Sequence, residues 1–243
     1  MMKILSLIAA RHKNAFANRS PRIVCLGDSV THGCFEVYID KDGRVETVYD
    51  TPSGYVRRLN DKLLALYPAS AVSIIDSGIS GDSSTGALKR FERDVAVYRP
   101  DLVTVCLGLN DSMTPDFEAG LAKYKANMTE IFARIRGLGA EALLITPNMM
   151  CSYVDPALKD ETLRNIAKAV TECQTGGRLD AYVDAAREVA REAGVPIADA
   201  YAEWQAMERA GIDTTALLSN HINHPTREMH DIFVNKIMEQ LLF

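Results

Sequence analysis

Residues 22–31 read RIVCLGDSVT, an apolar run that ends directly in Gly27, Asp28 and Ser29. The run lacks alternation of polar and apolar side chains, which is typical of a parallel strand covered on both faces. A glycine followed by short polar residues ends such a strand in a loop. The stretch therefore predicts a buried strand whose carboxyl end carries a serine hydroxyl.

The rest of the chain alternates similar apolar runs with amphipathic stretches. Further strands are expected at residues 72–76, 102–107, 142–146 and, more weakly, 195–198. Helices are expected at residues 3–17, 55–67, 87–98, 117–138, 156–173, 179–193 and 226–242. This alternation predicts a three-layer α/β/α sandwich around a mainly parallel five-stranded sheet. Because no linker or repeat interrupts it, residues 1–243 are expected to form one domain, with residues 1–20 as an N-terminal helical extension.

Residues 35–49, FEVYIDKDGRVETVY, depart from this alternation. Asp42 and Gly43 lie between two segments of alternating apolar and polar residues, which is a strong signal for a β-hairpin. The predicted hairpin insertion follows Ser29 closely in the chain. It is therefore either a surface decoration or a flap over the site that follows the first strand.

Composition excludes several classes of protein. Lys and Arg total 27 against 32 Asp and Glu, a net charge of −5, which argues against a nucleic-acid partner. The five cysteines show no close spacing, so we expect neither a disulfide framework nor a cysteine metal site. No apolar run approaches the ~20 residues of a membrane span, and stable membrane insertion is not expected. Basic residues follow the apolar residues 4–10 instead of preceding them, so no signal peptide is predicted and the expected location is cytoplasmic.

The loops after the predicted strands carry the parts of an acyl-transfer site. In an open parallel sheet, ligands bind at the carboxyl ends of the strands, where these loops meet. Acyl transfer needs a nucleophile, a base and donors for an oxyanion. Ser29 can supply the nucleophile, Gly81 a backbone N–H, Asn110 a side-chain N–H and His224 the base. No cofactor and no metal are needed for this chemistry.

At these positions the chain resembles the SGNH hydrolase family, also called GDSL-type esterases, whose signature residues are Ser, Gly, Asn and His in that order. The matching blocks are Gly27-Asp28-Ser29, Gly78-Ile79-Ser80-Gly81-Asp82, Gly108-Leu109-Asn110-Asp111 and His224-Pro225. The resemblance implies a flavodoxin-like hydrolase in which Ser29 attacks an ester with His224 as base. It also implies that the N–H groups of Ser29 and Gly81 and the Asn110 amide hold the oxyanion. Asp28 and Asp111 are expected to support these loops by hydrogen bonds.

One position departs from the family pattern. The family usually places Asp three residues before the catalytic His, but here that residue is His221. A neutral histidine cannot supply the negative charge that stabilises an imidazolium. A backbone carbonyl can orient His224 instead, which gives a Ser–His dyad, or His221, Asn220 or Asp213 can fold back to it. The third alternative is a weakly active or inactive protein.

The expected function is a serine esterase acting on a small ester, such as an acetylated carbohydrate or a short-chain acyl ester. The alternatives are an acyltransferase, a lysophospholipase or thioesterase of the same fold, and an inactive module that binds carbohydrate or acyl ligands. Met149, Met150 and Tyr153 follow the fourth strand and either fill the core and loop or form an apolar wall of the acyl pocket. The sequence carries no sign of the oligomeric state.

Overall fold

Apolar side chains alternate between the two faces of the central strands, and both faces are buried. In β1 (Arg22–Gly27), Ile23 and Cys25 pack into one apolar layer and Val24 and Leu26 into the other. The computed structural model, which describes residues 2–243, joins β1 to β4 (Ser73–Gly78), β5 (Leu102–Cys106), β6 (Glu141–Ile145) and β7 (Ile197–Ala198). The order is β4-β1-β5-β6-β7 with every pair parallel, so the predicted five-stranded sheet is confirmed. The strand order reverses beside β1, and such a switch point forms a crevice at the carboxyl ends.

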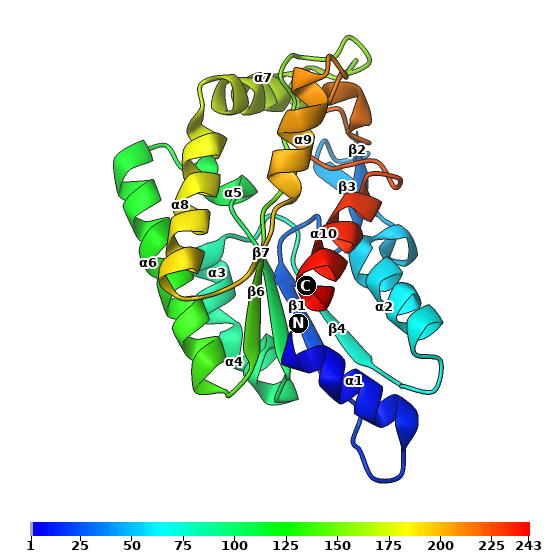
Figure 1. Ribbon diagram of the computed structural model, residues 1–243. Coiled ribbons are helices and arrows are strands. Elements are labelled where there is room, and N and C mark those ends of the chain that lie inside the picture. Colours follow the sequence, from blue (N-terminus) through cyan, green and yellow to red (C-terminus); the bar gives the residue numbers. More distant parts are fainter. Residues whose placement is uncertain (1) are drawn as a thin grey trace.

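Helices cover both faces of this sheet, as Figure 1 shows. One face carries α1 (Lys3–Lys13), α2 (Tyr55–Leu66), α9 (Ala200–Arg209) and α10 (His230–Leu242). The other carries α3 (Ser84–Lys89), α4 (Phe91–Asp94), α6 (Phe117–Gly137) and α8 (Arg178–Glu192). The short α5 (Leu109–Ser112) and α7 (Glu161–Thr175) lie toward the carboxyl edge. Within residues 2–243, no helix combines the length and apolar character of a membrane span.

The helix expected at residues 3–17 ends at Lys13, and the one expected at 226–242 begins at His230. Three further helical segments differ more from the sequence prediction. The single helix expected at residues 87–98 is wrong: α3, α4 and a 3₁₀ turn, Ala96–Tyr98, replace it, because Arg90 leaves helical geometry and turns its side chain inward. The start of α7 lies later than expected because the Asp160 carboxylate accepts the N–H groups of Thr162 and Leu163 as an N-cap. The unpredicted α9 is capped by Asp199 in the same way.

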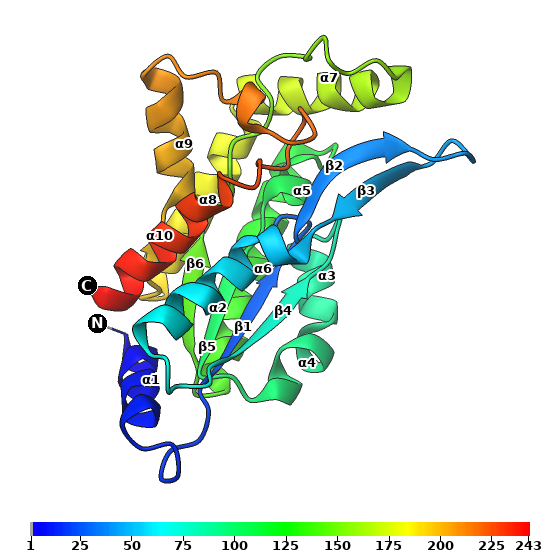
Figure 2. The same cartoon turned by 90° about the vertical axis from the view of Figure 1, so that its right-hand side faces the viewer.

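The predicted hairpin is present as a separate two-stranded antiparallel sheet. It consists of β2 (Cys34–Ile39) and β3 (Val45–Tyr49), and Gly43 in its turn has a φ of 76°. Its pairing register shifts between Cys34 and Val37, so β2 contains a bulge there. Figure 2 shows the hairpin projecting from the carboxyl end of the central sheet, on the side where α7 lies.

Candidate active site

Ser29 and His224 are 195 positions apart in the sequence and form a hydrogen-bonded pair at the carboxyl end of β1. The distance from Ser29 Oγ to His224 Nε2 is 3.0 Å. Both residues are buried. The turn that holds Ser29 is closed by the Cys34 N–H, which donates to the Ser29 carbonyl at 3.0 Å. A hydroxyl at this distance from an imidazole nitrogen has the arrangement of a nucleophile and its base.

The second ring nitrogen of His224 contacts a backbone carbonyl. Nδ1 lies 2.8 Å from the oxygen of Phe35, inside the bulge of β2. Because a carbonyl only accepts, Nδ1 carries the proton and Nε2 is left free to accept from Ser29. Burial lowers the pKa of His224, and the Phe35 carbonyl and the Glu36 carboxylate oppose that shift. The imidazole is therefore neutral at neutral pH, as a general base must be.

The three side chains considered as orienters of His224 contact other groups. His221 places Nδ1 2.9 Å from the Asp155 carboxylate, and Asp213 accepts the hydroxyl of Tyr153 at 2.7 Å. The side-chain oxygen of Asn220 accepts the backbone N–H groups of residues 222, 223 and 224. It therefore fixes the backbone of the loop and does not contact the imidazole ring. Of the alternatives for orienting His224, the structure therefore shows the backbone carbonyl in contact with the imidazole and none of these three side chains.

The three expected oxyanion donors face the cavity beside Ser29. Within residues 2–243, the backbone N–H groups of Ser29 and Gly81 donate to no backbone acceptor. Asn110 uses one amide hydrogen to donate to the Asp82 carbonyl at 2.8 Å, which leaves the other available. Gly81 has a φ of 77°, and among residues 2–243, its own atoms and chain neighbours aside, no heavy atom lies within 4 Å of where a Cβ would be. A left-handed glycine thus keeps that face of the loop open.

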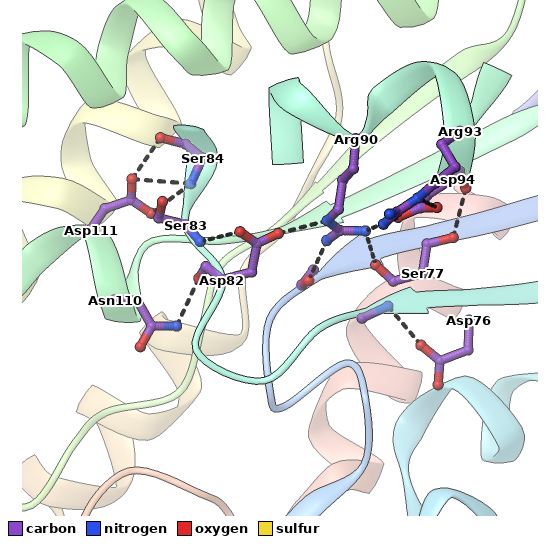
Figure 3. Close-up of polar contacts among 12 residues, drawn as sticks. Asp76, Ser77, Asp82, Ser83, Ser84, Arg90, Arg93, Asp94, Asn110 and Asp111 are labelled. Atoms are coloured by element: carbon purple, nitrogen blue, oxygen red, sulfur yellow. Dashed lines mark hydrogen bonds and ion pairs between the residues drawn. The ribbon is translucent and has the colours of Figure 1, made fainter. Parts of the chain in front are cut away.

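A buried guanidinium fixes the loop that carries Gly81 (Figure 3). Arg90 donates to the Asp82 carboxylate at 2.6 Å and to the Asp94 carboxylate at 3.2 Å. It also donates to the carbonyls of Ser77 and Gly27, at 2.8 and 2.9 Å, at the ends of β4 and β1. One side chain therefore links two strand ends to the segment whose carbonyl accepts from Asn110.

Asp111 and Asp28 support neighbouring loops. Asp111 accepts the N–H and hydroxyl of Ser84, the latter at 2.6 Å, and so joins the loop after β5 to the start of α3 (Figure 3). Asp28 accepts the Val30 N–H at 3.0 Å and helps to form the turn around Ser29. Burial raises the pKa of Asp28 to about 7.

A cavity of about 400 Å³ opens beside Ser29 and His224. Its apolar walls come from the hairpin, from α7 and from the loop before His224, through Val37, Val45, Leu163, Ile166 and Ile222. Its polar lining includes Glu46, Thr47, Tyr49 and Asn223.

The apolar residues after β6 do not form this wall. Met149 and Met150 are buried in the core, and Tyr153 pairs with Asp213, so of the two alternatives for these residues the structure favours core and loop filling. Leu163 and Ile166 do line it. No separate feature of the sequence predicts that role, because the spacing of these two residues on an amphipathic helix is also that of core residues.

A parallel α/β sandwich that holds a serine, an imidazole and free N–H donors at its carboxyl edge has the parts of an acyl hydrolase site. The profile of the GDSL-like lipase/acylhydrolase family matches residues 25–232. The chain belongs to this family. By class it is a carboxylic ester hydrolase.

Known relatives resemble the chain over most of its length. An acetylxylan esterase from Geobacillus stearothermophilus is 22% identical over 229 residues, 91% of this chain and 94% of that protein. An arylesterase from Vibrio mimicus is 26% identical over 159 residues, 64% of this chain and 70% of that protein. The crystal structure of the Geobacillus stearothermophilus enzyme Axe2 matches with a TM-score of 0.66 at 20% identity, covering 92% of this chain and 94% of that one. This structural likeness shows the shared fold.

Proposed function

We propose that the protein is a serine esterase that hydrolyses small carboxylic esters through an acyl-enzyme on Ser29. The observation that carries this proposal is the position of His224 between the Ser29 hydroxyl and the Phe35 carbonyl, 3.0 and 2.8 Å away. In this arrangement Nε2 can accept a proton, because the hydrogen bond from Nδ1 to the Phe35 carbonyl fixes the tautomer in which Nε2 is unprotonated.

The reaction follows from these positions. His224 Nε2 takes the proton of Ser29 as Oγ attacks the ester carbonyl. The N–H groups of Ser29 and Gly81 and the Asn110 amide then hold the negative oxygen. The imidazolium returns the proton to the leaving alcohol, and a water activated by the same nitrogen releases the acid from Ser29.

The orienting group in this proposal is the Phe35 carbonyl, so the catalytic unit is a Ser–His dyad. A carbonyl dipole fixes the tautomer and direction of the ring but carries no full charge. It therefore stabilises the imidazolium less than a carboxylate would. Asp28 and Asp111 support the site through the loops and take no part in proton transfer.

The proposed substrates are acetylated carbohydrates or short-chain acyl esters. A cavity of about 400 Å³ suits a small ester, and its lining combines apolar side chains with Glu46, Thr47 and Asn223. The names of the two relatives, an acetylxylan esterase and an arylesterase, agree with a short acyl group or a small ester.

The test is hydrolysis of p-nitrophenyl acetate and a series of longer acyl esters by the wild type, Ser29→Ala and His224→Ala. Each variant should lose kcat by at least about 10³-fold, because nucleophile and base act as a unit. Ser6→Ala, which alters an exposed serine of α1, is the matched control and should keep full activity. A folded Ser29→Ala protein with wild-type turnover would refute the proposal.

A further inference from the structure

The carbonyl that contacts His224 lies in a segment released from regular strand pairing. Cys34 pairs with Tyr49 and Val37 with Thr47, but the register shifts between these pairs. Phe35 lies in this bulge, so its carbonyl is free to accept from His224. Bulges are found next to active sites, where they redirect a group out of the sheet. Because the extra residue of a bulge is left unpaired in the ladder, contacts from outside the sheet are needed to fix its position.

Arg227, three residues after His224, contacts the bulge and the end of the hairpin at once. Its guanidinium donates to both Glu36 carboxylate oxygens, at 2.6 and 3.2 Å, and to Asp50 at 2.7 Å. It also lies over the ring of Phe35, with Cζ 4.4 Å from the ring centroid. A planar guanidinium can make a bidentate pair, a further ion pair and a ring contact together, which a lysine cannot.

The base of the same hairpin is tied to the nucleophile. The Cys34 N–H donates to the Ser29 carbonyl at 3.0 Å, and the Asp50 N–H donates to the Gly33 carbonyl at 2.8 Å. The segment held by Arg227 thus contacts Ser29 at one point and His224 at another. Its position controls the geometry of both members of the pair.

The cluster also carries charge. The hydrogen bonds from Arg227 hold the pKa values of Glu36 and Asp50 below their usual values, so both carboxylates are ionised at neutral pH. One guanidinium and two carboxylates leave the cluster with a net charge of −1. The Glu36 carboxylate of this cluster acts electrostatically on the His224 imidazole, whose Nδ1 contacts a carbonyl and which, within residues 2–243, pairs with no carboxylate.

We propose that Arg227 is a positioning residue for His224 that acts through the bulge of β2. It holds the Phe35 carbonyl against Nδ1, and the ion-pair cluster it forms with Glu36 and Asp50 supplies the negative charge near the imidazole. This inference rests on the proposed Ser29–His224 chemistry. It adds that the dyad depends on an ion-pair cluster outside the cavity lining.

The first test compares Arg227→Met with Arg134→Met. Arg134 is the matched control because it also pairs with a carboxylate, Glu130 at 2.8 Å, and lies over a phenylalanine ring, Phe91, away from the site. Arg227→Met should lower kcat/KM and the rate of Ser29 phosphonylation by a fluorophosphonate about 10–100-fold, since a small misplacement of a catalytic group has effects of this size. Arg134→Met should change neither. Arg227→Lys should recover part of the loss.

The second test uses Glu36→Gln, a change at a half-exposed side chain that leaves the core intact. Glu36 acts electrostatically on His224 and is paired with Arg227, which also binds Asp50. His230, which also interacts with His224, is neutral because burial lowers its pKa to about 3. Removing the Glu36 charge takes away a group that raises the His224 pKa. The acid limb of the kcat/KM profile should therefore move to lower pH, and its plateau should fall about tenfold.

The outcomes separate this inference from the proposed function. Wild-type phosphonylation and kcat/KM in folded Arg227→Met, while Ser29→Ala is inactive, would overturn the role of Arg227 and leave the esterase proposal standing. A kcat/KM profile of Glu36→Gln with the wild-type acid limb and plateau would also overturn the role of Arg227. This second test decides the matter even if Arg227→Met fails to fold. Activity retained by Ser29→Ala would instead refute the proposed function.

Discussion

His224 is held at both ring nitrogens and through its backbone. Its Nδ1 contacts the Phe35 carbonyl, its Nε2 contacts Ser29 and its N–H donates to Asn220. The neighbouring His221 takes a different direction, with a φ of 56° and its ring against Asp155. The ring of the residue three positions before the base therefore contacts Asp155 and not the imidazole of His224.

His221→Asp should therefore fail to raise activity. The new carboxylate would face Asp155, and the like charges would lower stability by up to about 1 kcal/mol at this partly exposed position. We expect kcat/KM within about twofold of the wild type and a lower Tm at low salt. His221→Asn, which tolerates the same backbone geometry without the charge, is the control. A rise in kcat/KM would show that an aspartate at 221 reaches His224.

Some residues of the site could be predicted from the sequence, and others could be found only in the structure. Ser29, Gly81 and Asn110 could be found because they follow predicted strands, and His224 because it completes the order of the family's signature residues. Phe35 could not, because every residue has a carbonyl and only the bulge singles this one out. Arg227 was equally hidden, since a cation near the C-terminus has many possible partners until the hairpin is placed.

At the scale of elements, the loop after β4 depends on how α3 is packed. Arg90 ends α3 early and enters the core, which the apolar pattern of residues 87–98 did not predict because an arginine usually lies on the surface. Gly86 lies in α3, where a Cβ would overlap the Asp82 carboxylate that Arg90 binds. The helix can approach the loop this closely only with glycine at that position.

Gly86→Ala should accordingly displace Asp82 and, through its carbonyl, Asn110. We expect kcat to fall about tenfold or more, because a donor for the oxyanion moves while the protein stays folded. Gly137→Ala in α6 is the control: among residues 2–243, no atom beyond its chain neighbours and its own helix backbone lies within 4 Å of the added Cβ, so the change should be neutral or stabilising by up to about 1 kcal/mol. Equal activity of the two variants in the same ester assay would contradict this role for α3.

For the molecule as a whole, the central sheet could be predicted better than the helix boundaries and the contacts of the hairpin. The buried strands carry continuous apolar runs, and their alternation with helices restricts the topology to few choices. The break in α3, the start of α7 and the capping of α9 depend on individual side chains whose partners lie elsewhere in the fold. The hairpin was visible from Asp42 and Gly43, but its contact with His224 required the tertiary structure.

Global stability should depend on the buried histidine at the start of α10. His230 accepts the Tyr55 N–H at 3.0 Å, and burial lowers its pKa to about 3. The unfolded chain binds its proton near pH 6.5, so this residue contributes stability above that pH and the contribution is lost as the pH falls toward 3. In urea titrations between pH 7 and 4, the free energy of unfolding should fall more steeply for the wild type than for His230→Asn.

The difference in slope between the two proteins should reach about 1.4 kcal/mol per pH unit below pH 6.5. The variant starts from a lower stability because a core contact is altered, so the slope is the readout and not the midpoint. All other titrating groups are common to both proteins and cancel in the comparison. Parallel curves over this range would show that His230 is not held neutral by the fold.

The central claim, that Ser29 is a nucleophile activated by His224, is tested most directly by intact-mass measurement after reaction with a fluorophosphonate. The account predicts one adduct per chain, mapped to Ser29, with none in Ser29→Ala and slow formation in His224→Ala. The absence of an adduct on Ser29 in the folded wild type, or an adduct formed equally fast in His224→Ala, would contradict it.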